Sequence, residues 1–63
     1  MSKAIIKEGT IVEIRAFDDV PRHRFRVTDV WKDKVVFGGV ALEGPLKGCY
    51  GEPCYKQIER VVT

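Results

Sequence analysis

The residues whose types and spacing favour binding chemistry are the alternating arginines of residues 21–26, Pro-Arg-His-Arg-Phe-Arg. In an extended strand, every second side chain projects to the same side of the sheet. Arg22, Arg24 and Arg26 are then expected to form a row of guanidinium groups about 6.6–6.8 Å apart. That distance is close to the spacing of successive phosphates along one nucleic-acid strand. Because guanidinium groups grip phosphate in a bidentate manner and stack on bases, the row predicts a polyanion-binding surface.

The positive charge of the chain is concentrated around this row. Five Lys and Arg side chains face two aspartates within residues 22–34, a net charge of +3, whereas the whole chain carries +2. Trp31, Tyr50 and Tyr55 are potential stacking surfaces for bases if they are exposed. The sequence therefore predicts a surface for RNA, DNA or a partner protein, made of Arg22, His23, Arg24, Arg26, Trp31, Lys32 and Lys34.

Two other interpretations of the arginine row stay open. A protein or peptide partner fits the same exposed, charged strand. A purely solvated face is the other, because charged side chains also protect edge strands from aggregation. In that case a cross-strand partner such as Glu13 is expected to neutralise part of the row.

The sequence predicts no catalytic residues, no metal site and no cofactor. His23 is the single histidine, and arginines flank it on both sides. Cys49 and Cys54 form one loose pair, whereas structural zinc takes four ligands, usually in two close pairs. Free, partly buried thiols are the favoured state of this pair. A local disulfide and a metal shared between subunits are the alternatives.

Alternating hydrophobicity predicts short strands almost throughout the chain. Strands are expected over residues 10–17 and 24–31, with a bulge near Thr28-Asp29 where the apolar phase shifts. Residues 31–34 are expected to form a hairpin turn before the apolar stretches 35–37 and 40–42, and one helical turn should lead into a last strand within 55–62. The predicted core residues are Val12, Ile14, Phe25, Val27, Val36, Val40, Ile58 and Val61.

These elements predict an all-β fold, a small five-stranded SH3-like barrel with a short helical turn before the last strand. Residues 1–63 form one domain, and so small a sheet is expected to close on itself to hide its edges. A closed barrel of this size is filled by its own side chains. An enzyme is therefore not expected, unless a homo-oligomer builds a pocket between its subunits.

Both ends of the chain resemble SH3-like barrels. Residues 7–15, Lys-Glu-Gly-Thr-Ile-Val-Glu-Ile-Arg, resemble the opening strand of these barrels, in which a glycine precedes an alternating strand. Residues 55–61 resemble their helical turn and last strand. Barrels of the KOW and Tudor-like kinds bind RNA, DNA or peptide, and plasmid-type dihydrofolate reductases of similar length work as tetramers around a pore. Those reductases use a Val-Gln-Ile-Tyr segment, whereas Glu59 follows Gln57-Ile58 here, so the resemblance implies no reductase activity.

A cytoplasmic location without membrane attachment is expected from the distribution of apolar residues. The apolar runs are two to four residues long, far short of the roughly 20 that cross a bilayer. The short apolar stretch after Lys3 is likewise much shorter than the roughly 7–15 residues of a secretory signal. The sequence thus predicts a small, non-enzymatic binding module.

Overall fold

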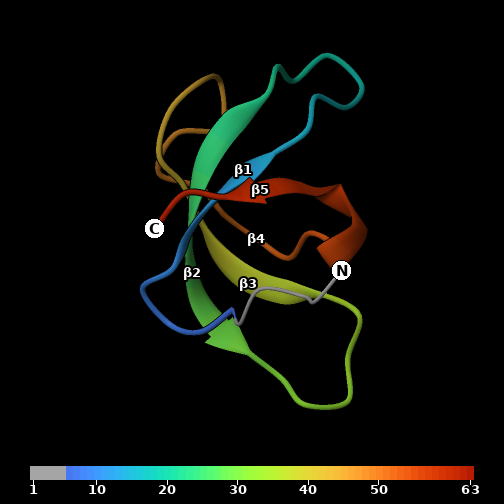
Figure 1. Cartoon of the computed structure of the whole chain (residues 1–63). Helices are drawn as coiled ribbons and strands as arrows, with labels where there is room; N and C mark the ends of the chain where they lie inside the picture. The colour runs from blue at the N-terminus through green and yellow to red at the C-terminus, as the bar shows by residue number, and fades with distance from the viewer. Residues whose placement is uncertain (1–5) are drawn as a thin grey trace.

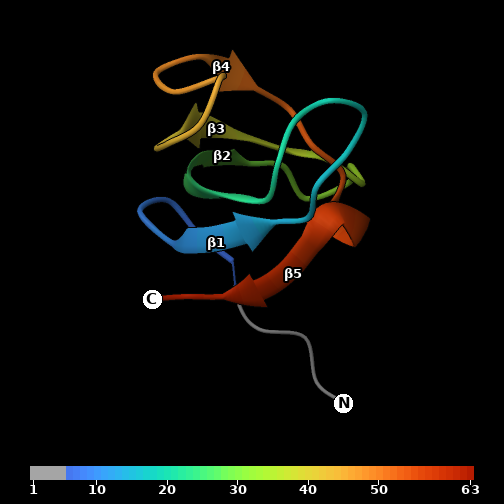
Figure 2. The same cartoon turned by 90° about the horizontal axis from the view of Figure 1, so that it is seen from above.

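The computed structural model describes residues 6–63 and shows an all-β chain with one short helical turn. Within this range one antiparallel sheet has the strand order β4-β3-β2-β1-β5, which Figure 2 displays from one edge to the other. The elements, labelled in Figure 1, are β1 (Ile11–Ile14), β2 (His23–Val30), β3 (Phe37–Ala41), β4 (Tyr50–Gly51), the 3-10 turn η1 (Tyr55–Gln57) and β5 (Ile58–Val61).

The sheet is open, because β4 and β5 lie at its two ends and do not pair with each other. The all-β class and the five strands are confirmed, whereas the expected closure is not seen. The edges are protected by other means. β4 is only two residues long, and β5 carries the exposed charges of Glu59 and Arg60. Short edge strands and edge charges both discourage pairing with another chain, so closure is not needed for that purpose.

The bulge expected in β2 is confirmed. Val27 lies opposite Gly39 and Asp29 lies opposite Gly38, so Thr28 is the extra residue of β2. A bulge bends its strand and increases the local twist. The longest strand of the sheet is therefore curved where it crosses the two glycines of β3.

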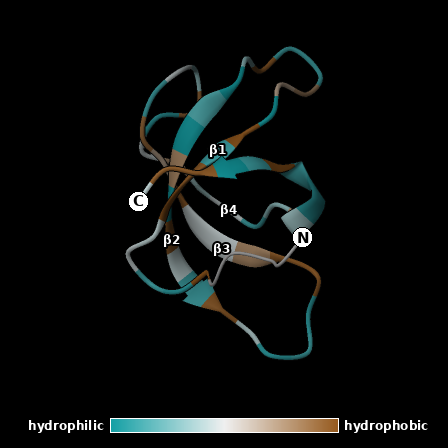
Figure 3. Ribbon diagram, in the orientation of Figure 1, coloured by the Kyte–Doolittle hydropathy of each residue, from teal (hydrophilic) through white to brown (hydrophobic). Residues whose placement is uncertain are grey.

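The core lies on the concave, inner face of the sheet. Its buried hydrophobic side chains are Val12, Ile14, Phe25, Val27, Phe37 and Ala41. The rings of Phe25 and Phe37 meet edge to face, with centroids 5.6 Å apart and planes at 87°, an arrangement that aromatic pairs favour. Hydrophilic and hydrophobic bands follow one another along β1 and β2 in Figure 3, as expected for strands with one buried face.

Four predicted core residues are confirmed as buried, namely Val12, Ile14, Phe25 and Val27. Ile58 and Val61 are half-buried and pack against this core.

The prediction that Val36 and Val40 belong to the core is wrong. Both are only half-buried, and Phe37, Gly39 and Ala41 face inward instead. In residues 35–42, apolar residues occur at both odd and even positions. Alternation therefore did not show which side of this strand faces the core. The large Phe37 ring, which is fully buried, occupies the core.

The two glycines of β3 continue the strand and do not interrupt it. A Cβ atom on Gly39 would collide with the carbonyl oxygen of Arg26 and with the ring of Phe25 on the inner face. A Cβ atom on Gly38 would collide with the hydroxyl group of Tyr50 on the outer face. Gly39 thus allows the ring of Phe25 to approach the backbone of β3 on the inner face, and Gly38 allows the Tyr50 hydroxyl group to do so on the outer face.

The turn expected at residues 31–34 is confirmed, and a second tight turn follows Phe17. Phe17 and Val20 bridge across Asp18 and Asp19, and Asp18 has a positive φ of 48°, which Asp tolerates better than most residues. Residues 31–34 form the turn between β2 and β3, and η1 leads directly into β5. The first strand is shorter than expected, because β1 ends at Ile14.

Among residues 6–63, no helix is long and apolar enough to cross a membrane. The expectation that no secretory signal follows Lys3 concerns residues that lie largely outside this range.

The contact between Phe25 and β3 gives a test of the fold. We expect Gly39→Ala to lower the free energy of unfolding by about 1–3 kcal/mol, because an added methyl group overpacks this contact. Gly51→Ala is the matched control. No heavy atom lies within 4 Å of a Cβ built on Gly51, so this change should be neutral or slightly stabilising. Urea denaturation of both variants measures the difference, and equal stabilities would contradict the close packing of Phe25 on β3.

Candidate functional site

All five arginines of the chain are exposed on the outer side of the sheet. Arg24 and Arg26 belong to β2 and Arg60 to β5, whereas Arg15 directly follows β1 and Arg22 directly precedes β2. Arg24 pairs with Glu13 of β1 in the antiparallel register, and Arg26 follows two residues later on the same face. Arg15, Arg22 and Arg60 line a shallow polar depression together with Glu13 and Glu59. We call Arg15, Arg22, Arg24, Arg26 and Arg60 the arginine face.

A second bulge places two consecutive charged residues of β5 on this side. Arg60 pairs with Glu13 and Ile58 pairs with Ile14, so Glu59 is the extra residue between them. Because of this shift, Glu59 and Arg60 are both exposed while Ile58 turns toward the core. Without the bulge, alternation would direct one of the two charges inward.

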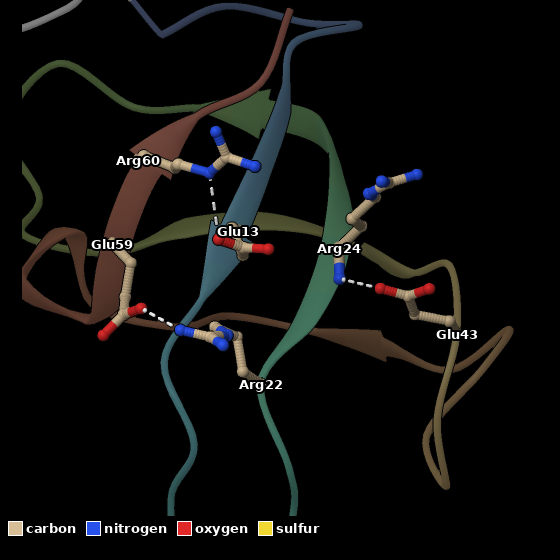
Figure 4. A network of polar contacts seen from close by, with 6 residues as sticks. All are labelled: Glu13, Arg22, Arg24, Glu43, Glu59 and Arg60. Atoms are coloured by element: carbon tan, nitrogen blue, oxygen red, sulfur yellow. Dashed lines mark hydrogen bonds and ion pairs between the residues drawn. The ribbon is translucent and has the colours of Figure 1, made fainter.

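Two ion pairs cross the arginine face, as Figure 4 shows. The Nη1 atom of Arg22 donates a hydrogen bond of 3.1 Å to Oε1 of Glu59. The Nε atom of Arg60 donates one of 3.0 Å to Oε1 of Glu13. The hydrogen bond to Glu59, with the negative charges of Glu13 and Glu59, raises the pKa of Arg22 above its ordinary value. Arg22 is therefore a cation at every pH at which the protein is folded.

The other guanidinium groups have no carboxylate within ion-pair distance among residues 6–63. These groups belong to Arg15, Arg24 and Arg26. Glu43 reaches the region, but its carboxylate accepts a hydrogen bond of 2.9 Å from the backbone N–H of Arg24 and leaves the side chain unpaired. Five guanidinium groups thus face three carboxylates, and the region keeps a net charge of +2.

The structure does not bring all the predicted site residues together. Arg22, Arg24 and Arg26 share the outer face, whereas His23 lies on the inner face and is only 3% exposed. Trp31, Lys32 and Lys34 lie in the turn that follows β2, whereas Arg22 directly precedes that strand. Figure 1 shows the turn between β2 and β3 at one end of β2.

The turn between β2 and β3 forms its own small cluster. The Nζ atom of Lys34 sits 5.2 Å from the centre of the Trp31 ring, a cation–π contact, and Lys32 is exposed beside them. Of the other proposed stacking residues, Tyr50 is 53% exposed. The ring of Tyr55 packs 5.1 Å from that of Phe37 and is therefore part of the interior.

Arg15 and Arg60 are the members of the arginine face that the sequence analysis missed. Arg15 lies two residues after Glu13, so strand alternation alone was a sufficient signal for it. Arg60 joins the face only because β5 pairs with β1, and no local pattern reports that pairing. Glu13 was expected to neutralise the row on β2, and it forms its ion pair with Arg60 instead.

A second candidate site is a pocket of about 320 Å³ on the inner face. Its apolar walls come from Ile14, Phe17, Phe25, Ala41, Leu46 and Pro53, and its remaining lining residues are His23, Cys49, Tyr50, Gly51, Glu52 and Gln57. The sequence led us to expect a chain filled by its own side chains, whereas this face carries a half-open pocket. The pocket exists because β4 and β5 do not pair, which leaves the interior accessible between β4 and η1.

Two loops complete the pocket. The tight turn at Asp18 and Asp19 returns Phe17 toward the core, where its ring lies 6.5 Å from that of His23. The loop between β3 and β4 has positive φ angles at Gly44 and Gly48, the left-handed conformation that glycine adopts at little cost.

Both thiols are free in this structure. Cys49 is exposed at the pocket and Cys54 is half-buried at the start of η1. The backbone N–H of Cys54 donates a hydrogen bond of 3.0 Å to Oε1 of Gln57, which holds the 3-10 turn. Within residues 6–63, no three His, Cys, Asp or Glu side chains gather in a way that could hold a metal ion.

The comparisons with known proteins assign no class to either surface. No protein-family model, no curated protein and no solved structure matches the chain.

Tyr50 gives a test of the electrostatics beside the pocket. Its hydroxyl oxygen lies 3.3 Å from Oδ2 of Asp29 and 3.2 Å from Oε2 of Glu52, and the two carboxylates share its single proton as acceptors. Partial desolvation, together with these two carboxylates, raises the pKa of Tyr50 above its ordinary value of about 10. The neutral phenol therefore stabilises the fold below pH 10, and this contribution is lost as the pH rises through the folded-state pKa.

We expect the phenolate absorbance of Tyr50 to appear with a midpoint above pH 10 in a Tyr55→Phe background, where Tyr50 is the remaining tyrosine. Adding Asp29→Asn should lower that midpoint, because it removes one of the two negative charges. A midpoint at or below 10 would contradict these contacts.

Proposed function

We propose that this protein is a small, non-enzymatic binding module whose arginine face contacts nucleic acid. The observation that carries the proposal is the placement of all five arginines on one face of three neighbouring strands. The lysines of residues 6–63 lie outside the strands, in turns, loops and η1. Arginine is the better phosphate ligand of the two, because its planar guanidinium donates two parallel hydrogen bonds to one phosphate.

The spacing of the side chains supports a phosphate backbone as the ligand. Arg22, Arg24 and Arg26 project at every second residue, about 6.6–6.8 Å apart along the strand direction. Arg15 and Arg60 widen this row on the neighbouring strands β1 and β5. A single strand of nucleic acid that follows β2 would therefore meet guanidinium groups at successive phosphates.

The two ion pairs of the arginine face are compatible with this role. Both arginines are well exposed, with 61% of the Arg22 side chain and 65% of the Arg60 side chain accessible. Exposed ion pairs contribute only about 0–1 kcal/mol, so a phosphate can replace the carboxylate of Glu59, whose side chain is itself 37% exposed, at little cost. Glu13 and Glu59 would then compete with phosphate for the arginines, which limits non-specific affinity and favours rapid dissociation of the nucleic acid.

We also propose that the open sheet is an SH3-like barrel that stays unclosed between β4 and β5. The strand order β4-β3-β2-β1-β5, the bulged and curved β2 and the 3-10 turn before β5 support this assignment. Small barrels of this kind serve many functions, so the fold by itself does not select nucleic acid.

A protein partner is the second candidate. It is favoured by the exposed hydrophobic side chains of Val35, Leu46 and Tyr50, which lie outside the arginine face. The two candidates differ in their response to salt. Phosphate contacts weaken steeply with ionic strength because binding releases counterions, whereas an apolar interface does not.

The test is an NMR titration with pooled DNA and RNA oligonucleotides at two salt concentrations. We expect shifts at residues 22–26 and at Arg15 and Arg60, and an affinity that falls with salt. The double variant Arg24→Gln/Arg26→Gln should reduce the slope of log K against log salt by about 1.4 for a single strand, since each phosphate contact contributes about 0.7.

Lys47→Gln/Lys56→Gln is the matched control, because it removes the same charge from residues outside the arginine face. It should leave the slope nearly unchanged. Absence of shifts in the arginine face at low salt, or equal effects of the two double variants, would exclude this surface as the nucleic-acid contact.

A further inference from the structure

The pocket on the inner face is lined by the single histidine of the chain, His23, whose ring makes one hydrogen bond among residues 6–63. His23 is 3% exposed, and its ring lies between those of Phe17 and Phe25, with both centroid distances at 6.5 Å. Its Nδ1 atom lies 2.9 Å from the carbonyl oxygen of Pro21. A carbonyl oxygen only accepts hydrogen bonds, so Nδ1 carries the proton and Nε2 is the acceptor in the neutral ring.

The remaining ring nitrogen of His23 is Nε2. No hydrogen bond within residues 6–63 reaches it, and no side-chain nitrogen or oxygen that is fully buried in this range lacks a partner. Nε2 is therefore accessible, and the accessible space that His23 lines is the pocket. An acceptor in a pocket with mainly apolar walls favours a ligand that carries an N–H or O–H group beside an apolar body.

Gly51 keeps the pocket open. It pairs with Gly39 across β3 and β4, so a Cβ atom on either residue would point to the inner face. At Gly39 that position is filled by the ring of Phe25, whereas at Gly51 no heavy atom lies within 4 Å. Packing therefore requires glycine at position 39 but not at position 51. The missing side chain of Gly51 leaves space in the pocket that it lines.

The lining residues also define the charge and size of the ligand. None of them is Lys or Arg, and Glu52 is the single acidic residue among them, with its carboxylate held by the Tyr50 hydroxyl group. An anion is therefore disfavoured. A volume of about 320 Å³ lies at the lower end of the roughly 300–1,000 Å³ of small-molecule pockets. The rings of Phe17 and Phe25 offer faces and edges for aromatic packing.

We propose that this pocket binds a small, uncharged aromatic molecule that donates an N–H or O–H hydrogen bond to Nε2 of His23. Indoles and phenols are the chemical class. The site is separate from the arginine face, because Glu13 and Arg24 project to the opposite side of the sheet from Ile14 and His23. The proposal thus does not depend on nucleic-acid binding.

The test compares indole with benzofuran, which has the same shape but an ether oxygen in place of the N–H group. Both are titrated into the intact protein while the amide signals of Gly51 and Gln57 are followed by NMR. We expect saturable shifts with indole and an affinity for benzofuran about five- to tenfold weaker, as for the loss of one hydrogen bond to a buried acceptor.

Two variants locate the site. Gly51→Leu should abolish indole binding while the protein stays folded, because its side chain enters open space, and Val40→Leu on the outer face is the matched control. His23→Phe should reduce the preference for indole over benzofuran to about one. If this variant does not fold, the comparison of the two ligands in the wild-type protein and in Gly51→Leu still decides the outcome.

Three results would overturn the proposal: no saturable shifts with indole, equal affinity for benzofuran, or unchanged binding by Gly51→Leu. Tighter binding of N-acetyl-tryptophanamide than of indole would also overturn it, and would assign the pocket to a side chain of a protein partner. The variant Arg24→Gln/Arg26→Gln should bind indole normally, so failure at this pocket and failure at the arginine face are distinguishable.

Discussion

The ring of Phe25 packs so closely on the backbone of β3 that a side chain at position 39 would collide with it. The same ring meets Phe37 edge to face, so the contact joins β2 and β3 to the centre of the core. The bulge at Thr28 bends β2 where it crosses the two glycines of β3. On the outer face, the hydroxyl group of Tyr50 reaches the backbone at Gly38. β3 is therefore contacted closely on both faces, by Phe25 at Gly39 and by Tyr50 at Gly38.

Curvature without closure gives the molecule two different surfaces. The convex side has little to pack against and carries charge, so side chains of β1, β2 and β5 gather there as the arginine face. The concave side encloses a core that a chain of 63 residues cannot complete. Where β4 and β5 fail to pair, the interior stays accessible, with His23 at its base. Because strand alternation separates the two faces, each can take a ligand without involving the other.

Local patterns gave correct predictions wherever neighbouring residues decide the structure. The phase shift near Thr28 indicated the bulge, and the mixed spacing of residues 55–62 indicated a helical turn followed by a strand. The prediction for Val36 and Val40 was wrong because apolar side chains occupy both phases of that strand. His23 was grouped with the arginines beside it in sequence, although its neighbours in a strand lie on the opposite face. Its burial depends on the aromatic rings that surround it.

The sequence by itself determined the strands, their turns and the row of arginines along β2, because alternation and turn chemistry act over a few residues. Tertiary structure decided which distant residues complete each surface. The pairing of β5 with β1 adds Arg60 to the arginine face, and the missing pair between β4 and β5 opens the pocket beside Gly51. Both outcomes depend on the order in which the strands lie across the sheet. That order depends on the volume of the core and the curvature of the sheet, and no local sequence pattern encodes either of them.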